Sequence, residues 1–108
     1  MPFPVDVVLE AREEMFAIAA GRQRPLPYLD RLEAAVAALG DREPGHPILH
    51  EQPDDPSLPL FRGLFVPPGR AEVRVIFHSG GTRVRVVHAR WAMNRPLSAR
   101  DLRRFARR

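Results

Sequence analysis

Arginine and histidine are the residues of this chain whose chemistry is most informative. All 17 basic residues among its 108 are arginines, and the chain contains no cysteine. The planar guanidinium group of arginine donates a fork of hydrogen bonds that fits phosphate, and it keeps its charge near neutral pH. Histidine titrates near neutrality and can accept or release a proton. Two of the four histidines, His78 and His88, lie among the arginines of the second half, so phosphate binding and proton transfer are the chemistry to look for.

The charges are divided unevenly along the chain. Residues 1–60 contain 5 arginines and 11 acidic residues, whereas residues 61–108 contain 12 arginines and only Glu72 and Asp101 as acidic residues. This asymmetry predicts a basic surface in the second half that binds an acidic partner such as a nucleic acid. The alternative is that the acidic half neutralises the basic half within the fold.

Length and composition predict one domain over residues 1–108, large enough to fold without disulfides or metals. The apolar runs are too short for a membrane span, and the N-terminus lacks the pattern of a secretory signal. The absence of cysteine is compatible with a cytoplasmic location. His46 and His50 have the spacing of a helical zinc pair, but Pro47 lies between them and no third ligand is evident. No metal or other cofactor is therefore expected.

The first half of the sequence has helical periodicity. Residues 3–9 favour a strand, although a helix that begins near Asp6 also fits. Residues 10–20 and 27–39 favour two helices that end at Gly21 and Gly40, and together they predict a helical hairpin. Residues 41–60 contain five prolines, which predict a loop.

The second half has the periodicity of strands. Residues 60–66, 71–78 and 82–88 favour three antiparallel strands, the last two joined through Gly80-Gly81. This turn predicts that Phe77 pairs with Val84 and Val73 with His88 on the core face. It would place Arg74, Arg83 and Arg85 together on the opposite, exposed face.

A short helix is expected to close the chain. Ser98 and Asp101 have the spacing of a capping box at its start, and arginines end it. The fold class predicted is α+β, with an N-terminal strand and helical hairpin packed on an antiparallel β-meander and a short C-terminal helix.

Two motifs in residues 60–108 follow the pattern of a known family. Val73-Arg74-Val75-Ile76-Phe77 stands where that family has "tyrosine-arginine-valine-isoleucine-tyrosine", at the start of the same hairpin. The segment from His88 to Arg95 runs into Leu97-Ser98 and a helix that ends in arginines. The chain thus resembles the RelE/ParE superfamily of toxins from type II toxin–antitoxin systems, and its tail is similar to the HigB-like branch. The similarity in residues 1–40 is one of element order.

This resemblance implies a toxin that inhibits translation as a ribosome-dependent mRNA endoribonuclease. A cognate antitoxin protein would neutralise it, and the ribosome and mRNA would be its other partners. The resemblance assigns Arg74 to the scissile phosphate and gives catalytic roles to His88 and Arg90. The candidate nucleic-acid contacts are Arg62, Arg83, Arg85 and Arg95. For His88, the predicted strand register favours a hydrogen-bonded core histidine unless a β-bulge turns its side chain.

The chain also departs from the family pattern. Phe65 and Pro67 occupy the region of the family's paired lysines, Ala92 and Met93 replace a later lysine pair, and no tyrosine follows Arg90. These departures favour a second hypothesis, in which the chain is a ParE-like gyrase inhibitor or a non-catalytic binding protein derived from a toxin. A third hypothesis is an arginine-rich nucleic-acid-binding protein unrelated to toxins.

Overall fold

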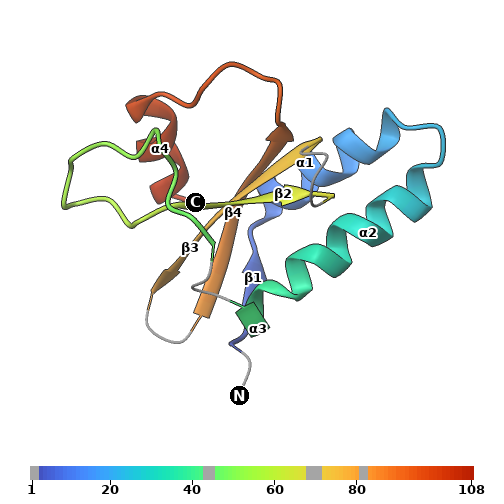
Figure 1. Cartoon of the computed structure of the whole chain (residues 1–108), viewed down its shortest axis with the longest axis horizontal. Coiled ribbons are helices and arrows are strands. Elements are labelled where there is room, and N and C mark those ends of the chain that lie inside the picture. Colours follow the sequence, from blue (N-terminus) through green and yellow to red (C-terminus); the bar gives the residue numbers. More distant parts are fainter. Residues whose placement is uncertain (1–2, 43–45, 68–71, 81–82) are drawn as a thin grey trace.

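The computed structural model describes residues 3–42, 46–67, 72–80 and 83–108. In chain order the elements are β1 (Val5–Val7), α1 (Leu9–Ala20), α2 (Pro25–Ala37), α3 (Leu39–Arg42), β2 (Arg62–Val66), β3 (Val73–Gly80), β4 (Arg83–Trp91) and α4 (Ala99–Ala106). The α+β class predicted from the sequence is confirmed (Figure 1). No helix in the described part of the chain is long and apolar enough to cross a membrane.

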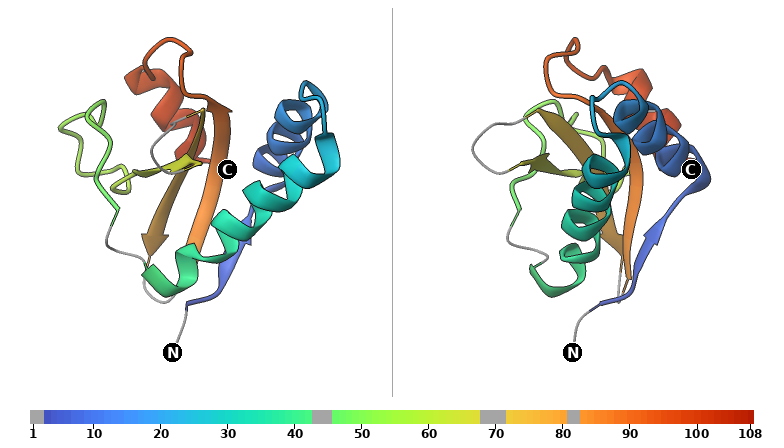
Figure 2. Two further views of the ribbon diagram at one scale, coloured as in Figure 1. Left: turned by 45° about the vertical axis from the view of Figure 1, so that its right-hand side comes forward. Right: turned by 90° about the vertical axis from the view of Figure 1, so that its right-hand side faces the viewer.

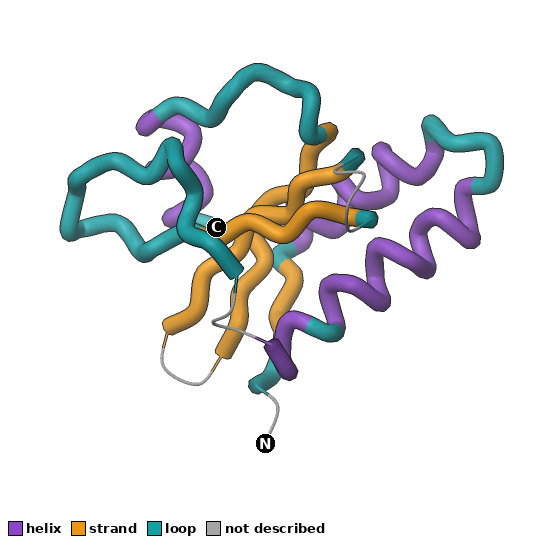
Figure 3. The backbone as a smooth tube through the Cα atoms, in the orientation of Figure 1, coloured by secondary structure: helices purple, strands orange, loops and turns teal. Residues whose placement is uncertain are grey.

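The described strands form one mixed sheet in the order β1-β4-β3-β2. Strands β2, β3 and β4 make the expected antiparallel meander, and β1 lies parallel to β4 at the edge. The hairpin of α1 and α2 packs on one face of this sheet (Figure 3). Apolar side chains from both layers, including Leu32, Phe77 and Val86, form the main hydrophobic core between them.

Gly40 does not end the second helix as the sequence predicts. Helix α2 ends at Ala37, and Gly40 lies inside the short helix α3. Its carbonyl oxygen accepts a hydrogen bond of 2.9 Å from the Phe3 amide. A Cβ atom at this position would lie 2.3 Å from the Phe3 carbonyl oxygen, so the close approach of the two backbones requires glycine.

The register of the β3–β4 hairpin also differs from the prediction. Gly80 was predicted to lie in the turn, but it continues β3 and pairs with Arg83. Residues 81 and 82 lie outside the described residues. Phe77 consequently pairs with Val86 instead of Val84. A shift of two residues leaves each side chain on its predicted face, because side chains alternate along a strand.

A β-bulge then turns His88 to the other face. The register changes between Ile76 and Phe77, so His88 pairs with Ile76 and the partner of Val73 is Trp91. The His88 ring stacks on Phe105 of α4, with 4.3 Å between the ring centroids. The expected pairing of His88 with Val73 is therefore wrong, and the alternative of a bulge is correct.

Part of the second face of the sheet is covered (Figure 2), so Arg74 is nearly buried, whereas Arg83 and Arg85 stay exposed as the sequence predicts. Helix α4 and the segment 46–61 close over it, and a second cluster of buried side chains lies beneath them: Leu49, Phe61, Ile76, Val87, Leu97, Leu102 and Phe105. Apolar side chains such as Ile76 and Val87 leave water only if this face is covered. The capping box at the start of α4 is confirmed, because Ser98 and Asp101 exchange hydrogen bonds of 3.1 and 2.9 Å.

Candidate functional site

A cavity of about 340 Å³ lies at the C-terminal end of β4, between α1 and α4. Three of the residues predicted from the sequence, His88, Arg90 and Arg95, line it together. The other side chains with polar groups that line it are Glu14, Trp91, Asn94, Asp101 and Arg104. We call this cavity the β4-end site.

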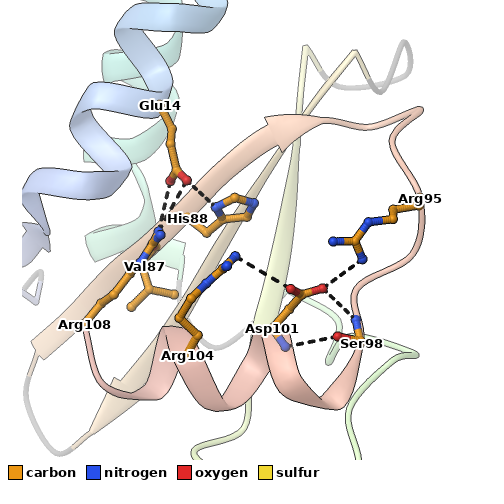
Figure 4. A network of polar contacts seen from close by, with 8 residues as sticks. All are labelled: Glu14, Val87, His88, Arg95, Ser98, Asp101, Arg104 and Arg108. Atoms are coloured by element: carbon orange, nitrogen blue, oxygen red, sulfur yellow. Dashed lines mark hydrogen bonds and ion pairs between the residues drawn. The ribbon is translucent and has the colours of Figure 1, made fainter.

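Glu14 and His88 form a hydrogen-bonded pair at this site (Figure 4). Glu14 Oε2 lies 2.9 Å from His88 Nδ1, and Glu14 also accepts hydrogen bonds from Arg108 and from the Ala89 amide. Burial raises the pKa of Glu14, but the hydrogen bonds from His88 and the Ala89 amide and the nearby charge of Arg108 outweigh it, so the pKa is lowered. Glu14 is therefore ionised at neutral pH.

The ionised Glu14 fixes the tautomer of His88. A carboxylate only accepts hydrogen bonds, so Nδ1 of His88 carries a proton and, in the neutral ring, Nε2 has a free lone pair. His88 is only 8% exposed, and its Nε2 has no hydrogen-bond partner within the described residues. Figure 4 shows this nitrogen turned away from Glu14. The pair thus has the arrangement of a general base held in place by a carboxylate.

Arg90 adds a poorly compensated positive charge. Burial and the neighbouring Arg95 lower its pKa, while Asp101 acts in the opposite direction. Its buried Nε atom has no hydrogen-bond partner in the described part of the chain. On the sheet it lies directly opposite Arg74, and like charges at such positions are unfavourable. A bound anion near the guanidinium group would offset this accumulation of positive charge.

Asp101 holds two further arginines at the mouth of the site. Its Oδ2 atom lies 3.1 Å from Arg95 Nη1, and its Oδ1 atom lies 3.6 Å from Arg104 Nη2 (Figure 4). Both arginine side chains remain more than half exposed. Hydrogen bonding with Ser98 is the main cause that lowers the pKa of Asp101 to about 2, so this anchor stays charged.

Arg74, which the resemblance assigns to the scissile phosphate, is occupied by a carboxylate. Its two terminal nitrogens bond both oxygens of Glu51, one of them at 2.7 Å, and both side chains are nearly buried. Glu51 also accepts a hydrogen bond of 2.9 Å from the Leu97 amide. The hydrogen bonds from Arg74 lower the pKa of Glu51 to about 2, although burial opposes them. This pair fastens the segment 46–61 to β3 and to the segment that precedes α4.

Arg62, Arg83 and Arg85 do not line the β4-end site. Arg62 donates a hydrogen bond of 2.6 Å to the His46 carbonyl oxygen, and Arg83 makes two hydrogen bonds with Asp6. Arg85 donates to the carbonyl oxygen of Arg108. His78 lies under the segment 46–61, with its ring 5.6 Å from that of Phe61, and burial lowers its pKa.

Glu14 is the functional candidate that the sequence prediction missed. It lies on α1 three residues after Ala11 and four before Ile18, both of which are buried. A carboxylate at this helical spacing faces the core, where it needs a partner. That mismatch was a usable signal, but its partner in β4 could not be identified without the bulge. Arg104 was not among the predicted site residues either, because nothing in the sequence distinguishes it from the other arginines of α4.

The β4-end site can bind a phosphate group and move a proton beside it. Arg90, Arg95 and Arg104 supply the charge, and the Glu14–His88 pair supplies the base. The described residues contain no group of three or more side chains placed to hold a metal ion. Comparison of the chain with family models, with curated proteins and with solved structures gave no match.

The two carboxyl groups with strongly lowered pKa values make the stability of the fold sensitive to acid. Glu51 and Asp101 each have a pKa of about 2 in the folded chain, below their ordinary values of 4.5 and 3.8. Their contribution, roughly 2–3 kcal/mol each, is complete above about pH 5 and is lost as the pH falls toward 2. Urea unfolding measured between pH 7 and pH 3 should show this decline. The variant Glu51→Gln should show a smaller decline, and a free energy of unfolding that stays constant down to pH 3 would contradict the assignment.

Proposed function

We propose that this chain is a toxin of the RelE/ParE type, related to the HigB-like branch, that cleaves mRNA on the ribosome. The observation that carries the proposal is the nearly buried His88, which Glu14 orients and which lines the β4-end site together with Arg90, Arg95 and Arg104. Its Nε2 atom is buried and has no hydrogen-bond partner in the described part of the chain. The element order, with a strand, a helical hairpin, a meander and a terminal helix, agrees with the resemblance in the sequence motifs. A ribosomal target and a cognate antitoxin follow from that resemblance.

The chemistry that fits these residues is attack by the RNA's own 2′-hydroxyl group. His88 Nε2 takes the hydroxyl proton, the oxygen attacks the adjacent phosphorus, and the bond from phosphorus to the 5′-oxygen breaks. The leaving oxygen takes a proton from water, and the His88 imidazolium returns its proton to the hydroxide that remains. The products are a cyclic 2′,3′-phosphate and a 5′-hydroxyl end. Arg90 and Arg95 stabilise the negative charge that builds up on the phosphate in the transition state.

Induction of this chain in a bacterial host tests the proposal in cells. Growth arrest is expected, with total mRNA cut within translated regions, and the variant His88→Asn should restore growth at equal protein levels. Co-expression of an open reading frame adjacent to the gene should also restore growth if it encodes the antitoxin. Normal growth with a soluble, folded wild-type chain would contradict the proposal.

A second candidate is a non-catalytic binding protein on the same scaffold, or a gyrase-directed toxin. The observation that favours it is the engagement of Arg74 by Glu51, which leaves the expected phosphate contact unavailable. Growth arrest with intact mRNA and inhibited DNA supercoiling would select the gyrase-directed form. Binding of a protein partner without growth arrest would select the other.

A further inference from the structure

Three cavities lie in series at one end of the molecule. The first, about 560 Å³, is formed by α4 and the segment before it, and five arginines line it: Arg95, Arg100, Arg103, Arg104 and Arg107. It shares Arg95, Asp101 and Arg104 with the second cavity, the β4-end site. The third, about 460 Å³, lies where α1 connects to α2. Figure 1 and Figure 2 both show this connection at the same end of the molecule as the segment before α4.

Arg22 joins the second cavity to the third. Its guanidinium carbon lies 4.6 Å from the centre of the Tyr28 ring and 5.8 Å from the Trp91 ring. Trp91 lines the β4-end site, whereas Arg22 and Tyr28 line the third cavity. Arg22 thus lies over one aromatic ring from the lining of each cavity. Aromatic and guanidinium planes of this kind stack with unpaired nucleobases.

The third cavity is basic, although it belongs to the acidic half of the sequence. Three of the five arginines in residues 1–60, namely Arg22, Arg24 and Arg31, line it, and Glu72 is its only acidic lining residue in the described chain. Glu72 is already engaged by Arg22 at 3.1 Å and by the Tyr28 hydroxyl at 3.2 Å. Arg24 and Arg31 are exposed. The net charge of the first half therefore conceals a local basic patch at the end where the second half is also basic.

We propose that single-stranded RNA follows these three cavities, from α4 across the β4-end site to the α1–α2 connection, where Arg24 and Arg31 form a distal phosphate subsite. The inference rests on the proposed function, because the 2′-hydroxyl step selects RNA over DNA at the β4-end site. The second and third cavities include Trp91 and Tyr28 in their linings and fit unpaired bases, whereas a duplex keeps its bases stacked on each other. Arginines at both ends contact the backbone without reading its sequence.

Equilibrium binding of fluorescent RNA tests the distal subsite. The probes are a single-stranded RNA of about eight nucleotides, within the range that single-strand-binding domains cover, and an RNA of about three nucleotides that fills only the β4-end site. Both carry 2′-O-methyl groups, so that they cannot be cleaved. Binding is measured over a series of salt concentrations for the wild-type chain, for the double variant Arg24→Ala/Arg31→Ala and for Arg12→Ala. Arg12 is a matched control, because it is an exposed arginine of α1 that lines a different, apolar cavity.

The double variant is expected to weaken binding of the long RNA and to leave binding of the short RNA unchanged. The slope of log affinity against log salt should become shallower by about 0.7 for each phosphate that the variant no longer neutralises, and by about 1.4 for both. Arg12→Ala should keep the wild-type slope. A duplex RNA of equal length should bind more weakly than the single strand.

Three results would overturn the inference. The first is an equal slope of log affinity against log salt for the double variant and the wild-type chain. The second is an equal loss of affinity for the long and the short RNA in the double variant. The third is the absence of RNA binding by the wild-type chain. The first two leave the proposed function intact, because cleavage at the β4-end site does not require the distal subsite. The proposed function fails separately if long RNA binds through Arg24 and Arg31 but His88→Asn does not relieve growth arrest.

Discussion

Replacing His88 by asparagine is expected to lower the rate of RNA cleavage by about 10²–10⁴-fold, the usual contribution of a general base. Asparagine can keep a hydrogen bond to Glu14 but has no second nitrogen to accept the hydroxyl proton. The rate constant for cleavage of ribosome-bound mRNA, measured with purified components, gives the effect. Because the substitution also removes the stacking on Phe105, Phe105→Leu is the matched control. It removes the same ring stacking but keeps the base, so its activity per folded molecule should stay near that of the wild-type chain.

Glu14→Gln tests the orienting role of the carboxylate. The amide of glutamine can offer a hydrogen-bond donor to Nδ1, and the ring then carries its proton on Nε2 and cannot act as a base. The loss should lie near the low end of the same range and should appear in the cleavage rate constant, with RNA affinity unchanged. An unchanged rate constant would show that Glu14 has only a structural role at the edge of β4.

Replacing Arg74 by alanine is expected to destabilise the fold by about 3–5 kcal/mol, because it leaves Glu51 buried and charged without its partner. This is a large part of the total stability of a small domain. The resemblance had assigned a phosphate contact to Arg74, which predicted a loss of toxicity in a variant that still folds. Chemical unfolding of Arg74→Ala, monitored by circular dichroism, decides between a structural role for Arg74 and a phosphate contact. A large loss of stability supports the structural role, and an unchanged stability supports the phosphate contact.

The double variant Arg74→Met/Glu51→Leu separates structure from catalysis. Replacing both members of a buried ion pair by apolar side chains is often neutral or stabilising, so this variant should fold. Since the β4-end site does not use Arg74, the variant should also retain most of the cleavage activity. A folded but inactive double variant would return the phosphate contact to Arg74.

The sequence was sufficient to predict every element of the described chain except the short helix α3, because helical and alternating periodicity record which face of each element is buried. Gly21 and the capping box of Ser98 appear at the predicted kinds of position, and so do the four prolines of the described segment 46–60, which lie in a loop. The site was predicted less well. His88, Arg90 and Arg95 line the same cavity, as the sequence led us to expect. Their arrangement there depends on the bulge at Val87 and on the segments that cover the second face of the sheet. Both features depend on contacts between distant parts of the chain, which the sequence does not show.

Contacts between distant parts of the chain also explain two errors of the sequence prediction. One is the phosphate contact assigned to Arg74, and the other is the acidic character assigned to the whole of residues 1–60. An arginine that alternates with apolar residues along a strand is expected on the exposed face, but the proline-rich segment brings Glu51 onto Arg74. The average charge of residues 1–60 also hides that Arg22, Arg24 and Arg31 gather at the end of the helical hairpin. Charge counts along a sequence say little about how charges are grouped once helices bring residues of the same sign together.

The most direct test of RNA cleavage at the β4-end site replaces one oxygen in the substrate. After the cut is mapped on a ribosome-bound mRNA, the same mRNA is prepared with a 2′-deoxy nucleotide on the 5′ side of that cut. The wild-type chain is expected to cleave the normal mRNA to a cyclic 2′,3′-phosphate and a 5′-hydroxyl end, and to leave the deoxy mRNA intact while binding it equally well. Equal cleavage of both substrates, or cleavage of neither, would contradict the role given to His88 and to the site as a whole.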